Sequence, residues 1–162
     1  MSGILDLLNS DLGKTIISGV AGQTNQPQNK TQDVLTMALP VLMAAMKRNA
    51  ATPQGAEGLM GALKGKHDGS ILDNLGGLFS GGVDQNVMTD GEKILGHVLG
   101  NKQQNVQSTL GAKAGMDAGS VAQILKVAAP ILMGVLGNQA KQQNVSGPSG
   151  IEGLLRGLLK GN

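Results

Sequence analysis

Reactive and aromatic side chains are scarce in this chain. It contains no Cys, no Trp and no Tyr, and Phe79 is its single aromatic residue. The lack of Cys excludes disulfides and thiolate chemistry, and a single aromatic ring essentially excludes base stacking on single-stranded nucleic acid. Charged residues make up only 15% of the 162 residues, and 13 basic against 11 acidic side chains leave a net charge of +2. The basic residues are scattered, so nucleic acid is not an expected partner.

Targeting signals are lacking as well. The first residues, MSGILDLLNSDLGK, carry acidic residues and lack the basic segment, apolar core and cleavage site of a signal peptide. No apolar run approaches the roughly 20 residues that span a bilayer, and the longest, residues 37–46, is interrupted by Pro40. We therefore expect a cytoplasmic protein.

The chain does contain an internal repeat. Residues 37–43, MALPVLM, align with residues 127–133, VAAPILM, at an offset of 90, and four of the seven positions are identical. Residues 53–63, PQGAEGLMGAL, align with residues 148–158, PSGIEGLLRGL, after a five-residue insertion, and six of the eleven positions are identical. The same type of segment therefore occurs twice, in the same order.

These matches predict one domain over residues 1–162 that is built from two pseudo-symmetric repeats. Repeat one spans residues 3–65, repeat two spans residues 93–160, and a linker with one helix of its own, residues 66–92, joins them. Two copies are too few for a solenoid array, so we expect the pair to share one core.

Apolar residues recur at helical spacing throughout, as in the stripe formed by Leu12, Ile16 and Val20. No segment alternates with the period of two that marks a strand. The pattern predicts an all-α fold of about eight to nine short helices. Pro40 and Pro130 fall inside the long helix of each repeat, where proline removes a backbone donor, so both helices are expected to be kinked.

Polar residues ahead of the apolar stripes predict where helices begin. Thr31 is predicted to cap a helix over residues 32–49, and Thr52 to cap a helix that starts at Pro53. Thr89 with Glu92 matches a capping box and predicts a helix start there.

Candidate catalytic or metal-binding residues are few. His67 and Asp68 are adjacent and form a weak candidate polar site, but two neighbouring ligands cannot close a metal site, and no third ligand has a suitable spacing. The alternative is that Asp68 caps the next helix while His67 is hydrogen-bonded nearby. His97 is expected to be half-buried and hydrogen-bonded. We therefore predict no catalytic residue, no metal and no cofactor.

Glycines recur at intervals of four residues in two segments. One set is Gly96 and Gly100, and the other is Gly153, Gly157 and Gly161. Each glycine inside a helix costs about 1 kcal/mol relative to alanine, so a compensating interaction is expected. Either these glycines allow close helix crossings within the core, or they form a face through which the protein self-associates.

Three Gly/Leu-rich stretches resemble a known family. They are residues 65–77, GKHDGSILDNLGG, residues 90–100, DGEKILGHVLG, and residues 129–136, APILMGVL. Their order and spacing resemble the bacterial domain-of-unknown-function family 937, the YidB-like proteins, over roughly residues 34–137. The resemblance implies an all-helical fold and a bacterial source. It implies no activity, cofactor or catalytic residue, so it assigns no role to His67, Asp68 or His97.

Three hypotheses for the function follow. The first is a non-enzymatic helical interaction or structural protein that forms homo-oligomers, supported by the scarcity of catalytic groups and by the low net charge. The second is a membrane-surface or nucleic-acid binding module, which lacks an aromatic anchor and a basic cluster. The third is an enzyme or metal site that uses His67 and Asp68. The eight methionines are interpreted as core filling, with a pliable partner groove as the alternative.

Overall fold

Helices make up the regular secondary structure of the described part of the chain. The computed structural model describes residues 4–64, 70–80, 84–145 and 148–160, and no strand occurs among them, which confirms the all-α fold class. In chain order the α-helices are α1 Ile4–Asn9, α2 Asp11–Thr24, α3 Gln28–Asn49, α4 Pro53–Lys64, α5 Leu75–Ser80, α6 Gln85–Leu99, α7 Gln103–Ala114, α8 Ala118–Gln142 and α9 Pro148–Lys160. The 3-10 helices are η1 Ser70–Asn74 and η2 Gly100–Lys102.

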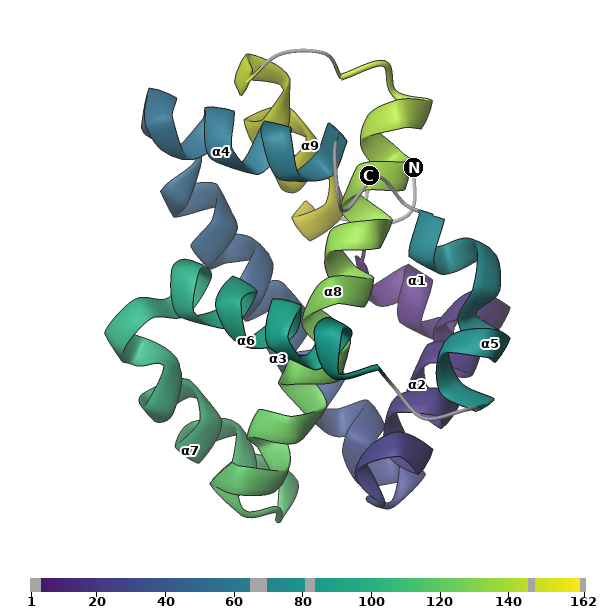
Figure 1. Ribbon diagram of the computed structural model, residues 1–162. Helices are drawn as coiled ribbons and strands as arrows, with labels where there is room; N and C mark the ends of the chain where they lie inside the picture. The colour runs from purple at the N-terminus through teal and green to yellow at the C-terminus, as the bar shows by residue number, and fades with distance from the viewer. Residues whose placement is uncertain (1–3, 65–69, 81–83, 146–147, 161–162) are drawn as a thin grey trace.

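Helix α8 lies at the centre of the molecule (Figure 1). It contacts α2, α3, α4, α6, α7, α9 and η1. All its residues from Val127 to Gly137 are buried, so no side of that stretch faces solvent. In the view of Figure 1, α6 and α7 cover one side of α8, α1, α2 and α5 cover the other, and α4 and α9 lie together at one end.

The apolar length of α8 differs from the sequence expectation. Among the described residues, α8 alone is long and apolar enough to cross a membrane by length and composition, and 72% of its most apolar stretch is buried inside the molecule. The sequence expectation concerned uninterrupted apolar runs, whereas α8 passes on its mean hydropathy with Lys126 inside the stretch. A core helix enclosed by neighbours passes the same test.

The helix starts agree with the sequence only in part. Thr52 caps α4 as predicted, since its Oγ1 accepts a hydrogen bond of 3.1 Å from the N–H of Gly55. Thr31 is not a cap. Helix α3 begins at Gln28, three residues before Thr31. The buried Thr31 hydroxyl donates to the Pro27 carbonyl at 2.9 Å.

Helix α6 also begins earlier than predicted. Its cap is Asp84, whose carboxylate accepts a hydrogen bond of 2.9 Å from the N–H of Asn86. Thr89 therefore lies inside the helix, and the capping-box prediction there was wrong. The half-buried Val87 and Met88 extend the helix ahead of Thr89, because Met88 packs against the core.

The linker covers two of the core helices. It forms η1 followed by the short α5 rather than one continuous helix. Ile71 in η1 lies against Gly134 of α8, and Phe79 in α5 lies against Gly19 of α2. The linker thus adds apolar cover to both halves of the molecule.

The α2–α3 turn and the α7–α8 turn meet at the opposite end from α4 and α9 (Figure 1). The Nε2 of Gln26 donates to the Oγ of Ser120 at 3.1 Å, and the Nζ of Lys30 donates to the Gly115 carbonyl at 3.1 Å. Each bond joins the first half of the chain to the second.

Candidate functional site

Two of the glycines singled out from the sequence face open space. Gly153 on α9 and Gly96 on α6 are both exposed, and a Cβ atom built on either would meet nothing within 4 Å. Neither glycine therefore permits a close crossing with another described element of its own chain. Of the two explanations for these glycines, close packing within the core does not apply at these two positions.

The other glycines of the proposed face differ from one another. Gly100 has φ +57° and ψ −131° at the end of α6, a backbone conformation that residues other than glycine rarely adopt. The turn into η2 therefore already accounts for this glycine. Gly157 is half-buried on α9, and Gly161 lies outside the described residues.

Close helix crossings occur at glycines that the sequence reasoning did not select. A Cβ at Gly91 of α6 would collide with the carbonyl group of Lys126 on α8. Gly91 precedes the buried Leu95 and Leu99 at intervals of four, so it lies on the apolar stripe of α6. Position on that stripe is the signal that distinguishes Gly91 from Gly96, and it was available in the sequence.

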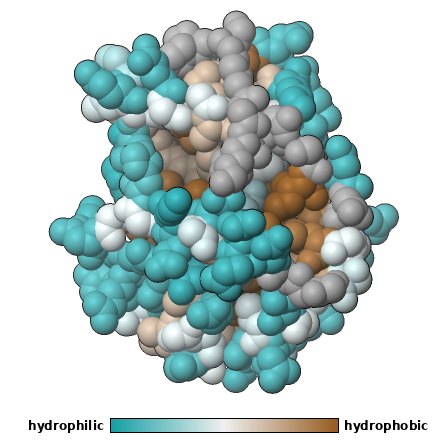
Figure 2. All heavy atoms as spheres, viewed as in Figure 1, coloured by the Kyte–Doolittle hydropathy of each residue, from teal (hydrophilic) through white to brown (hydrophobic). Residues whose placement is uncertain are grey.

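A cavity of about 400 Å³ lies between α4 and α6. Helices α3 and α8 close its inner side with the buried Met46 and Met133. Figure 2 shows apolar side chains in the hollow between α4 and α6, with polar residues around it. Gly55, Gly58, Leu59 and Ala62 line the cavity from α4, and the two glycines contribute no side chain to it.

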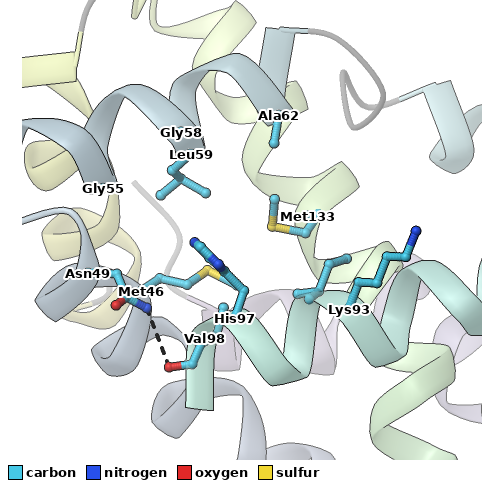
Figure 3. A pocket seen from close by; sticks show the side chains of 11 residues that line it. Met46, Asn49, Gly55, Gly58, Leu59, Ala62, Lys93, His97, Val98 and Met133 are labelled. Atoms are coloured by element: carbon cyan, nitrogen blue, oxygen red, sulfur yellow. Dashed lines mark hydrogen bonds between the residues drawn. The ribbon is translucent and has the colours of Figure 1, made fainter. Parts of the chain in front are cut away.

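Few polar groups line this cavity. Among the described residues they are the side chains of Asn49, Lys93 and His97 (Figure 3). The Asn49 amide is already used, since its Nδ2 donates to the Val98 carbonyl at 3.4 Å. His97 is exposed, rather than half-buried as the sequence suggested, and its imidazole points from α6 toward α4.

The other sequence candidate, His67 with Asp68, lies outside the described residues. Within the described ranges, no group of three or more His, Asp or Glu side chains is arranged to hold a metal ion. Sequence reasoning missed the α4–α6 cavity as a site because its lining comes from four helices, α3, α4, α6 and α8, and only α3 and α4 are consecutive in the chain.

Comparison with known proteins gives one family. The model of the family described as bacterial protein of unknown function, DUF937, matches residues 6–139. No curated protein and no solved structure matches the chain.

Proposed function

The chain belongs to DUF937, a family of bacterial proteins of unknown function, and from this starting point we propose that it is a non-enzymatic helical protein that acts by self-association. The single observation that carries the proposal is the exposed Gly153. Helix α9 is held to α3 and α4 by the buried Ile151, Leu154 and Leu155. Gly153 lies outside that contact and touches nothing within 4 Å.

A second copy of the chain would explain why glycine occurs there. Glycine within a helix is destabilising by roughly 0.5–1 kcal/mol relative to alanine. Close approach of a backbone from another chain would offset this cost, because the missing side chain lets two helices meet at short distance. The half-buried Gly157, one turn further along α9, would widen the same face. The net charge of +2 offers little electrostatic repulsion between copies.

Within one chain, we propose that repeats 3–65 and 93–160 form a pseudo-symmetric pair. Helices α3 and α8 begin 90 residues apart, and α2 packs on α8 just as α7 packs on α3. Each buried residue of α3 has a buried counterpart 90 positions later in α8. The buried residues of α3 are Thr31, Val34, Leu35, Ala38, Leu39, Leu42, Met43, Ala45 and Met46.

The turns before the long helices follow the same spacing. Asn25 and Gly115, 90 residues apart, both have left-handed backbone conformations, with φ of +57° and +71°. The N–H of Gln26 donates to the Ala21 carbonyl, and the N–H of Met116 donates to the Gly111 carbonyl, again 90 residues on. We propose that Pro40 and Pro130, which share this offset within α3 and α8, kink both helices in the same place.

The alternative functions have weaker support. A membrane-surface module would need an aromatic or strongly basic anchor, and a nucleic-acid binding module would need a basic cluster. An enzyme would depend on His67 and Asp68 alone, because the chain has no Cys and only one other His. A cytoplasmic location and action without a cofactor are part of this proposal as expectations from the sequence.

Light scattering coupled to size-exclusion chromatography tests self-association. We expect the mass of the parent protein to rise above 16.5 kDa as its concentration increases. A Gly153→Leu variant should stay near the monomer mass with an unchanged or higher melting temperature, because the new side chain meets no atom of its own chain. Gly22→Leu is the matched control, since Gly22 is also exposed on a helix with nothing within 4 Å. Equal masses for Gly153→Leu and the parent at every concentration would disprove the proposed face.

A further inference from the structure

We propose that the α4–α6 cavity is a binding site for an amphipathic carboxylate, with an alkyl tail in the apolar interior and the carboxylate at Lys93. The cavity volume of about 400 Å³ lies within the range of roughly 300–1,000 Å³ that is usual for small-molecule sites. This site is separate from the α9 face and does not depend on self-association.

The interior of the cavity suits a flexible hydrocarbon. Its walls include Met46, Leu59, Ile94 and Met133. The two methionines come from different long helices, and their unbranched thioether side chains adapt to the shape of a bound chain. The alkyl tail would therefore find apolar contact on several sides.

Glycine keeps the cavity open. Gly58 is an exposed residue of the cavity lining, and a Cβ there would meet nothing within 4 Å, so a larger residue would fit at the cavity rim without a backbone clash. A side chain there would also improve the helix propensity of α4. The chain has glycine instead, although filling the space would bury apolar surface.

The charge of the cavity lining indicates which kind of ligand headgroup would bind. Among the described residues that line the cavity, Lys93 is the one charged side chain, and none of them carries a carboxylate. Lys93 lies on α6 one turn before His97, and in Figure 3 the exposed ammonium group points outward, away from the imidazole. An ammonium group and an imidazole N–H complement a carboxylate, whereas a cationic ligand would be repelled.

The two repeats differ at these polar positions. With the offset of 90 that the proposed pseudo-symmetry uses, Lys93 corresponds to Gly3 and His97 corresponds to Leu7. At the same offset an apolar residue of the cavity lining is kept, since Met133 corresponds to Met43. Only one of the two repeats therefore carries the polar pair, which supports a role for this pair beyond the shared architecture.

Calorimetry on the full chain tests the ligand class with three ligands of equal tail length. They are decanoate and decyltrimethylammonium, both kept below their micelle-forming concentrations, and decanol, kept below its solubility limit. We expect decanoate to bind at one site per chain, about two- to fivefold more tightly than decanol, which is the range of an exposed ion pair. The cation should bind most weakly. Absence of decanoate binding at millimolar concentration, or equal affinity for all three ligands, would overturn the proposal.

Matched variants locate the site. Gly58→Leu should abolish decanoate binding by filling the cavity, whereas Gly61→Leu should leave it unchanged, because Gly61 is exposed on the same helix and does not line the cavity. Lys93→Gln should reduce the affinity for decanoate to that for decanol and leave decanol binding unaltered. Decanoate binding that survives Gly58→Leu would place the site elsewhere and refute the proposal.

Methionine methyl resonances provide a readout that does not depend on a variant folding. With 13C-methyl methionine in the parent protein, decanoate should shift the signals of Met46 and Met133. Met116, at the turn between α7 and α8, serves as the internal control. Shifts at Met116 without shifts at the two cavity methionines would contradict the assignment.

Discussion

At the scale of single residues, the helical glycines divide by what a side chain in their place would meet. Gly91, Gly134 and Gly19 lie against atoms of another element, and substitution there would force a collision. Gly96 and Gly153 face open space. The glycines of the first group allow two elements of the chain to pack closely. No close contact within the chain accounts for the glycines of the second group.

Gly91 and Gly96, on the same helix, allow a direct comparison. Gly91→Ala should lower the free energy of unfolding by about 1–3 kcal/mol, because the new methyl group collides with the Lys126 carbonyl group on α8. Gly96→Ala should raise it by roughly 0.5–1 kcal/mol, since only helix propensity changes. Urea denaturation of both variants measures the two effects. Destabilisation of equal size by both would contradict the difference in packing.

At the scale of elements, the turns that follow α2 and α7 each depend on one residue with a left-handed backbone conformation. Asn25 and Gly115 follow these helices in the left-handed region. Their N–H groups donate to carbonyls of the last helical turn, which reverses the chain toward the next long helix. Asparagine and glycine are the residues that adopt this conformation most readily.

Gly115→Ala should cost about 1–2 kcal/mol of stability, because an L residue with a side chain is strained at φ +71°. The nearest atom to the new methyl group would be the Lys30 Nζ at 3.8 Å, so steric contact contributes little. Asn25→Gly should be neutral or slightly stabilising. Gly119→Ala, in the first turn of α8, is the control and should not destabilise. Thermal unfolding distinguishes these results, and full stability of Gly115→Ala would refute the role of the turn.

Element type could be predicted from the sequence because the apolar spacing is helical throughout. Helix starts could not always be predicted, since several polar residues qualify as caps and only tertiary contacts decide among them. Thr31 and Thr89 matched cap patterns, but both helices begin earlier, α3 at Gln28 and α6 at Gln85. The α4–α6 cavity could not be predicted, because helical spacing does not reveal which helices of a bundle become neighbours.

At the scale of the whole molecule, stability is unequally distributed around α8. The middle of α8 is buried on all sides, whereas α7 is covered on one face only, with Leu110, Gly111 and Ala114 as its buried residues. Local opening requires the least exposure of apolar surface at the periphery. The outer helices should therefore open without α8, while α8 should open only when the whole domain unfolds.

Hydrogen exchange measured by mass spectrometry checks this order. Peptides covering residues 124–136 of α8 should exchange slowest, at the rate set by global unfolding, and peptides from α7 should exchange faster. Protection in α7 that equals or exceeds protection in α8 would contradict the central position of α8 as the source of stability.

The position of α8 along the chain also bears on synthesis at the ribosome. Its partners α2, α3, α4, α6 and α7 and the linker helix η1 all precede it in the sequence, and α9 alone follows it. When this apolar segment leaves the exit tunnel, nearly every surface that will enclose it has already been made. This apolar helix can therefore dock as it emerges, which shortens its exposure to chaperones, to the membrane-targeting machinery and to neighbouring nascent chains.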